Sequence, residues 1–186
     1  MLPAAHPTDP TGQVSGLETE VLRYHADSVE LIELLGLYSE QPNDLIELAC
    51  LGEASLPPDI WAPAHLPAGL AASLFGYSDL TETAVTVYLP ADGADTVELT
   101  LRQCPASAHS PLLVGKSAQT SVVQLPDSLG TLVRGAWVPA SEETLFWDQN
   151  ARELCAVWKR AGQVLTLEAQ GLSAREVRAI MGSFGA

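Results

Sequence analysis

The amino-acid sequence predicts an α+β fold: a curved antiparallel β-sheet, arranged as a meander and packed by a C-terminal helix, with an N-terminal helical segment. Alternation of apolar and polar residues over 85–101, and strand-length runs over 120–168, predict the sheet. A capped amphipathic pattern at 173–184 predicts the terminal helix. The length of 186 residues and the hydrophobic content of 47% suit one domain with a helical extension.

The N-terminal part is predicted to be a leader followed by helix. Residues 1–16 are rich in Pro, Thr, Gly and Ser, which indicates a flexible leader. Helical periodicity then places a set of apolar side chains near one face: Leu17, Val21, Tyr24, Leu31, Leu35 and Tyr38. Ser28 and Gly36 interrupt this pattern, so one helix and two helices with a kink are equally compatible with it, and Pro42 ends it.

A second short helix and a proline-rich linker are predicted next. Asn43 can cap a helix from Asp44 to Leu51. Prolines punctuate 53–70, so this zone is expected to be an irregular covering segment, with Trp61 against the core. The helical extension and its linker therefore occupy 17–65.

The sheet domain is predicted to occupy 66–186 and to begin with a β-hairpin. Its strands, 85–89 and 97–102, alternate apolar and polar residues on either side of a turn at 90–95. Residues 105–118 are expected to be a loop. Further strands joined by short turns complete the meander: 120–125, 131–138, 143–148, 153–159 and 163–168.

The last element is predicted to be a helix that packs against the sheet. Ser173 is the expected N-cap, and Glu176 three residues later completes a capping box. The apolar stripe of this helix consists of Val177, Ile180, Met181 and Phe184. Arg175 and Arg178 are expected to face outward.

The charge of the chain excludes several classes of partner. The formal net charge is −14, with nine Lys and Arg residues against 23 Asp and Glu. Nucleic acid needs a basic stripe, which this sequence lacks, and anionic membrane surfaces are disfavoured for the same reason. No apolar run reaches the ~18 residues of a membrane span. The first residues do not resemble a secretory leader, so two explanations stay open: a cytoplasmic protein, or one whose leader or anchor was removed.

A search for reactive motifs gives no catalytic, cofactor or metal site. None of the four histidines has a His or Cys neighbour at metal-ligand spacing. There is no GxSxG motif, and Gly115-Lys116-Ser117 lacks the earlier glycine of a phosphate-binding loop because position 110 is Ser. Carboxylates are plentiful, but no pattern pairs them across a cleft. The sequence therefore predicts a protein that is not an enzyme and needs no cofactor.

The three cysteines, Cys50, Cys104 and Cys155, are too widely spaced for a zinc or redox motif. Buried free thiols are the favoured interpretation. A Cys104–Cys155 disulfide between strands is the alternative in an oxidising compartment.

The tryptophans are the candidate binding residues. Trp137, Trp147 and Trp158 all lie on the late predicted strands. Core packing explains such rings most simply. The functional interpretation is an apolar groove along the concave face of the sheet, which would hold a lipid chain or a partner peptide.

Several stretches resemble a bacterial extracytoplasmic domain of unknown function. They are LPAG at 66–69, LTLRQ at 99–103, GTLVRGAW at 130–137, VWKRAG at 157–162 and LSAREVRAIMGSF at 172–184. The similar domain occurs in anti-sigma factors and in proteins related to sigma-E regulation and outer-membrane lipoprotein sorting. Leu165 and Met181 depart from the family's Tyr and Ala.

This resemblance covers about 66–184 and implies an extracytoplasmic location, in the periplasm or cell envelope, with a missing leader or anchor. It carries no catalytic residues. The leading hypothesis is therefore a non-enzymatic binding or regulatory domain that recognises a protein or lipid in an envelope-signalling role of the anti-sigma type. The alternatives are a cytoplasmic interaction module that binds through its N-terminal helices, and an unrecognised hydrolase.

Overall fold

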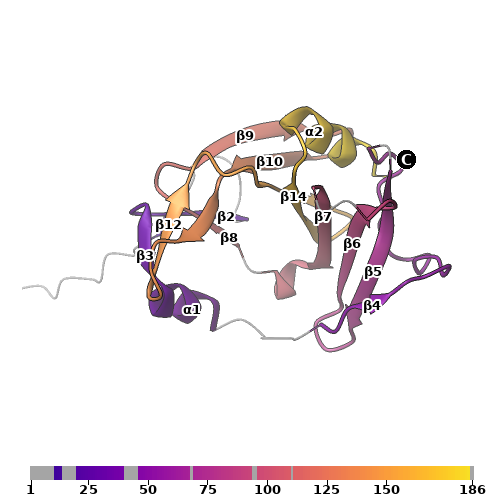
Figure 1. The fold of residues 1–186 in the computed structure, drawn as a ribbon, viewed down its shortest axis with the longest axis horizontal. Helices are drawn as coiled ribbons and strands as arrows, with labels where there is room; N and C mark the ends of the chain where they lie inside the picture. Colours follow the sequence, from indigo (N-terminus) through magenta and orange to yellow (C-terminus); the bar gives the residue numbers. More distant parts are fainter. Residues whose placement is uncertain are drawn as a thin grey trace, which may run out of the picture.

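The computed structural model describes residues 11–13, 20–39, 46–67, 69–93, 96–109 and 111–184. Its main sheet has eight antiparallel strands in the order β4-β5-β6-β7-β14-β13-β10-β9 and curves from β9 round to β4 (Figure 1). The strands are β4 (Ala49–Cys50), β5 (Leu70–Ser78), β6 (Thr83–Pro90), β7 (Glu98–Pro105), β9 (Gln119–Gln124), β10 (Leu129–Arg134), β13 (Leu154–Arg160) and β14 (Gln163–Gln170).

The predicted meander is present in part. Consecutive strands pair in β5–β6–β7, β9–β10 and β13–β14, as short turns dictate. The last strand, β14, however, lies between β13 and the much earlier β7. Strands 85–89 and 97–102 are confirmed as β6 and β7, and the C-terminal helix is confirmed as α2 (Ala174–Gly182).

Two small sheets accompany the main one. The first contains β1 (Thr11–Gln13), β2 (Val21–Tyr24) and β8 (Leu112–Val114); the second contains β11 (Ala136–Pro139), β12 (Thr144–Asp148) and β3 (Ser28–Glu30). The pairing of β2 with β8 is parallel. The remaining helices are α1 (Leu31–Ser39) and the short 3₁₀ helix η1 (Ala106–Ala108).

Side chains alternate between two faces of the main sheet, and each face has its own core. On the first face, Leu154, Trp158 and Leu167 pack with the buried side of α2. On the second face, Val157 and Val164 pack with residues of the small sheets. In Figure 1, α2 lies along one end of the sheet, by β9 and β10, whereas β3 and β12 stand apart from it. The β13–β14 region is thus covered on both faces.

The cap of α2 forms as its sequence predicts. The Ser173 hydroxyl accepts a hydrogen bond from Glu176 N–H at 3.3 Å, and Glu176 Oε2 accepts from Ser173 N–H at 2.8 Å. This exchange satisfies two backbone donors that the helix leaves unpaired, which stabilises such a terminus by about 1 kcal/mol. Val177, Ile180 and Met181 are buried on the first face.

The segment before β5 covers the first face as expected. Trp61 packs against the core, and its backbone N–H and C=O bond the amide side chain of Gln103 at 3.0 and 3.1 Å. The Arg160 guanidinium stacks over the Trp61 ring at 4.6 Å. Pro63 forms an isolated bridge with Phe184, beyond the end of α2. These contacts hold a proline-rich strap, residues 57–67, to the sheet.

The prediction of helix from residue 17 is wrong over residues 20–30 and is confirmed only for Leu31–Ser39. Residues 21–24 and 28–30 are strands, and helix begins only at Leu31. The apolar residues that suggested one helical face instead pack between the sheets. Val21 lies in the second-face core, and Tyr24 packs with Leu113. Long-range strand pairing overrides the local pattern here.

The second predicted helix, Asp44 to Leu51, is also not found. The first two residues of that segment lie outside the described residues, as does most of the predicted leader 1–16. The described part of the segment is irregular up to β4. The predicted loop 105–118 contains η1 and β8, and the predicted strand 131–138 divides into β10 and β11. The division occurs at Gly135, whose φ of 113° suits glycine alone.

Candidate functional site

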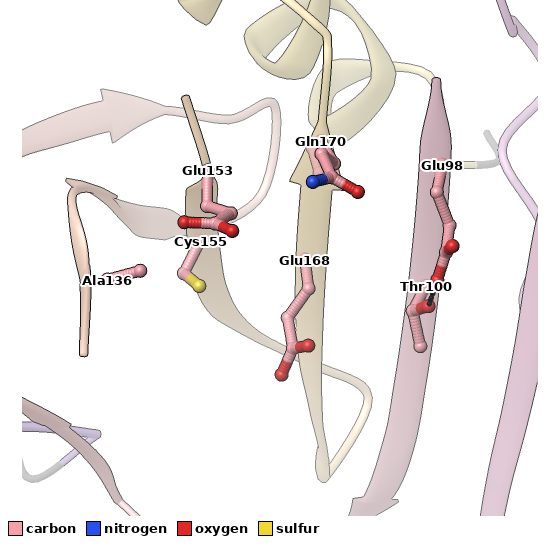
Figure 2. Close-up of a pocket in the computed structure, with 8 residues that line it drawn as sticks. Glu98, Thr100, Ala136, Glu153, Cys155, Glu168 and Gln170 are labelled. Carbon is pink, nitrogen blue, oxygen red and sulfur yellow. Dashed lines mark hydrogen bonds between the residues drawn. The ribbon is translucent and has the colours of Figure 1, made fainter. Parts of the chain in front are cut away.

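A concave cavity of about 300 Å³ opens on the second face of the main sheet, beside the small sheets (Figure 2). It lies over the central strands β7, β14 and β13, and β11 forms one wall. Its lining consists of Glu98, Thr100, Ala136, Glu153, Cys155, Glu168, Ala169 and Gln170.

Strand register places the polar side chains of the floor in rows. Glu168 of β14 is directly opposite Cys155 of β13 on one side and Thr100 of β7 on the other. Gln170 is opposite Glu98 in the next row. Because all of these residues alternate with apolar residues of the first face, they point together toward the cavity. Thr100 donates a weak hydrogen bond of 3.5 Å to Glu98 Oε1.

The third carboxylate comes from the residue before β13. Glu153 is half-buried, and its carbonyl accepts a hydrogen bond from Gly135 N–H at 3.3 Å. This backbone contact fixes β11 against the start of β13, so Ala136 overhangs the floor. Figure 2 shows Glu153, Glu168 and Glu98 arriving from three neighbouring segments of chain. The site is therefore a strongly acidic hollow.

Glu168 is electrostatically the most perturbed of the three carboxylates. Crowding by the surrounding strands desolvates it and raises its pKa, and the nearby Glu98 adds to this rise, whereas Arg102 opposes it. The residue as a whole is nevertheless exposed to solvent at the mouth of the cavity. It makes no hydrogen bond or ion pair with any other residue of the described ranges. An incoming cation is the partner that such a group lacks.

The thiol in the cavity is chemically quiet. Burial raises the pKa of Cys155 to about 12, and the carboxylates of Glu168 and Glu153 contribute to the rise. The thiol is consequently protonated at neutral pH, whereas a nucleophile or metal ligand must be a thiolate. In the part of the chain that the structure describes, no group of three His, Cys, Asp or Glu side chains is arranged to hold a metal ion.

The three tryptophans proposed as a groove are not brought together. Trp158 is buried on the first face, edge-on to Phe184 with ring centroids 5.2 Å apart. Trp147 is buried on the second face, with the half-buried Trp137 edge-on at 5.3 Å. Trp137 also donates from Nε1 to the Leu113 carbonyl at 3.0 Å. All three act in packing, and none lines the acidic cavity.

The alternative Cys104–Cys155 disulfide does not form, because all three cysteines are free. Cys104 of β7 is opposite Val164 of β14. Val164 is in turn opposite Lys159 of β13, and Lys159 is four residues along that strand from Cys155. That offset amounts to roughly 13 Å along the strand and about 10 Å across the sheet. A disulfide needs Cα atoms within about 7 Å. Of the three, Cys104 is buried and Cys50 is exposed.

A second charged group on the same face escaped the sequence analysis. Glu20, just before β2, lies 2.9 Å from His109 Nε2 and 2.8 Å from Lys159 Nζ. Burial lowers the pKa of His109; Arg102 and Lys159 act in the same direction, whereas Glu20 opposes them. The cluster ties the segment before β2 to the loop before β8 and to β13. Glu20, His109 and Lys159 are too far apart in the sequence to form a recognisable motif.

Comparisons with protein-family models, with curated proteins and with solved structures find no match for this chain. The resemblance to the bacterial extracytoplasmic domain therefore stays a prediction. Among the described residues, no helix has the length and apolar character needed to cross a membrane.

Proposed function

We propose that this chain is a non-enzymatic binding or regulatory domain and that the acidic cavity is its ligand site. The observation that carries the proposal is the acidic lining of the cavity: Glu98, Glu153 and Glu168 all line it, and Glu168 has no hydrogen-bonding partner among the described residues. Such groups occur preferentially where a ligand supplies the missing interaction.

The ligand that suits the cavity is a cationic group, an ammonium or guanidinium, presented by a protein partner. Glu98 and Glu153 line the same cavity as Glu168, so a positive charge entering the hollow is attracted by the combined field of three carboxylates. The net charge of −14 steers cations toward the surface from a distance. This lining suits an acyl chain poorly, which favours the protein over the lipid among the two partner classes considered from sequence.

The biological setting follows from the sequence resemblance. On that basis the domain acts outside the cytoplasm, in an envelope-signalling role of the anti-sigma type. The helix α1 supports a second candidate, a cytoplasmic interaction module: its Ile32 is 77% exposed and its Leu35 58% exposed. Exposed apolar residues on one helix are typical of a protein contact. The two candidates differ in which surface a partner covers.

A titration with a pentalysine peptide tests the proposal. We expect Glu168→Gln to weaken binding about tenfold, since a hydrogen bond to a charged group contributes about 1.5 kcal/mol or more. Glu142→Gln is the matched control, because Glu142 is exposed in the turn between β11 and β12.

Three outcomes would contradict the proposal. One is equal weakening in both variants, which would indicate bulk charge alone. Another is a bound lipid in protein purified from cells and analysed by native mass spectrometry. The third is loss of peptide binding on Ile32→Asp with none on Glu168→Gln, which would transfer the function to α1.

A further inference from the structure

A second cavity, of about 250 Å³, lies on the first face of the main sheet, where α2 approaches the edge strand β9. Leu132 and Leu154, both buried, lie beneath it. Arg134 at the end of β10 and Arg178 on α2 contribute its charged side chains. Its charge is thus opposite to that of the acidic cavity, which lies on the other face.

The two arginines come from separate elements, line the same cavity and are both exposed. Strand register sets Arg134 directly between Gln119 of β9 and Leu154 of β13. Arg178 leans from α2 toward the same strand, where its Nη2 donates to Ser121 Oγ at 3.3 Å. Arg178 is exposed, as the helical pattern predicts. The guanidinium groups therefore flank a small hollow that Gln119 and Ser121 complete on the β9 side.

No carboxylate within the described ranges neutralises this pair. The ion pairs found there involve Glu20 and Asp127, not Arg134 or Arg178. Glu176 on the same helix is engaged elsewhere, since its Oε2 accepts from Ser173 N–H at 2.8 Å and from the Ser173 hydroxyl at 2.7 Å. A chain with 23 acidic and nine basic residues thus brings two arginines to one cavity with no acidic partner among the described residues. Like charges at close range repel, and an anion between them removes the repulsion.

We propose that this cavity binds an oxyanion, a carboxylate or phosphate group, between Arg134 and Arg178. Guanidinium groups present paired N–H donors whose spacing matches two oxygens of such an anion. The Gln119 amide and the Ser121 hydroxyl add neutral donors at the rim. Ala174, in the first turn of α2, completes the lining on the helix side.

The test is a titration of the whole chain with inorganic phosphate at constant ionic strength, followed by the side-chain Nε–Hε resonances of the arginines in NMR spectra. We expect the Arg134 and Arg178 signals to shift in a saturable manner, and Arg175 to remain unchanged. Arg134→Gln and Arg178→Gln should each weaken binding at least tenfold. Arg175→Gln, which removes an exposed charge from the same helix outside the cavity, should leave it intact.

A parallel titration with acetate separates the two oxyanions: saturation by acetate alone assigns the site to carboxylates, and saturation by phosphate alone assigns it to phosphate groups. The proposal is overturned if neither anion gives saturable shifts at Arg134 and Arg178, or if Arg175→Gln weakens binding as much as the cavity variants. Glu168→Gln should not alter phosphate binding, so this result is independent of the function proposed for the acidic cavity.

Discussion

Replacement of Gln103 by Leu should detach the strap formed by residues 57–67. Gln103 is only 2% exposed, and its amide makes two hydrogen bonds to the backbone of Trp61, at 3.0 and 3.1 Å. Leu has a similar volume but can make neither bond, and it leaves the N–H and C=O of Trp61 without their partner. Each lost bond costs about 1 kcal/mol, and partial desolvation of the orphaned groups adds to this, for a total of about 2–3 kcal/mol.

Urea unfolding, followed by tryptophan fluorescence, measures this loss directly. For a chain of this size the same destabilisation lowers the melting temperature by about 4–12 °C. Limited proteolysis should also cut the strap faster in this variant, because local opening of the strap no longer has to break the two hydrogen bonds to Gln103. Gln119→Leu is the matched control, since Gln119 is exposed on β9. An unfolding midpoint for Gln103→Leu equal to that of the control would refute this account of the strap.

Three further predictions concern charge and capping. Glu168→Gln should raise the urea midpoint at neutral pH, because the raised pKa of Glu168 favours its neutral form. The gain should shrink as the pH falls through that raised pKa and vanish well below about pH 4.5, where the carboxylate is protonated in both folded and unfolded states; a constant gain would contradict it. The pKa of His109 is lowered in the folded state, so as the pH falls the unfolded chain takes up this proton before the folded chain does. The stability of the protein should therefore fall below about pH 6.5. His109→Gln should reduce this pH dependence in a series of melting temperatures. Ser173→Ala should cost about 1 kcal/mol in urea unfolding by removing the cap of α2, with Ser141→Ala, in the turn before β12, as a comparison of the same chemistry at an exposed turn.

Elements with local signals could be predicted from the sequence. The hairpin of β6 and β7 follows from its two-residue period, and α2 follows from the capping box at Ser173. The N-terminal segment could not be predicted this way, because β2 forms by pairing with β8, about 90 residues later. No window of neighbouring residues contains that information. The same reason hides the position of β14 between β7 and β13.

The candidate site was only partly accessible to sequence reasoning. The alternation of Glu98 and Thr100 with Leu99 was visible, but it indicated an ordinary solvent-facing side of a hairpin. What makes that side a cavity is the overhang of β11, which depends on the bend at Gly135 and on three-dimensional proximity. The tryptophan pattern was equally visible, yet alternation along strands distributed the rings to opposite faces. The residue type of the tryptophans indicated that they pack in the interior, but it could not indicate which face of the sheet each one occupies.

The position of β14 at the centre of the main sheet also constrains how the chain acquires its structure. β7 ends at Pro105, and the strand that completes its outer edge begins at Gln163. During synthesis, a nascent chain that has formed β4 to β7 therefore presents an unsatisfied row of backbone donors and acceptors until β14 emerges from the ribosome. Such unpaired strand edges promote aggregation. Pairing of β14 with β7 is also expected to be slow, because the two strands are far apart in the sequence. Pairing of β14 thus closes the main sheet at the end of folding, and a chain truncated before β14 should accumulate as an insoluble intermediate.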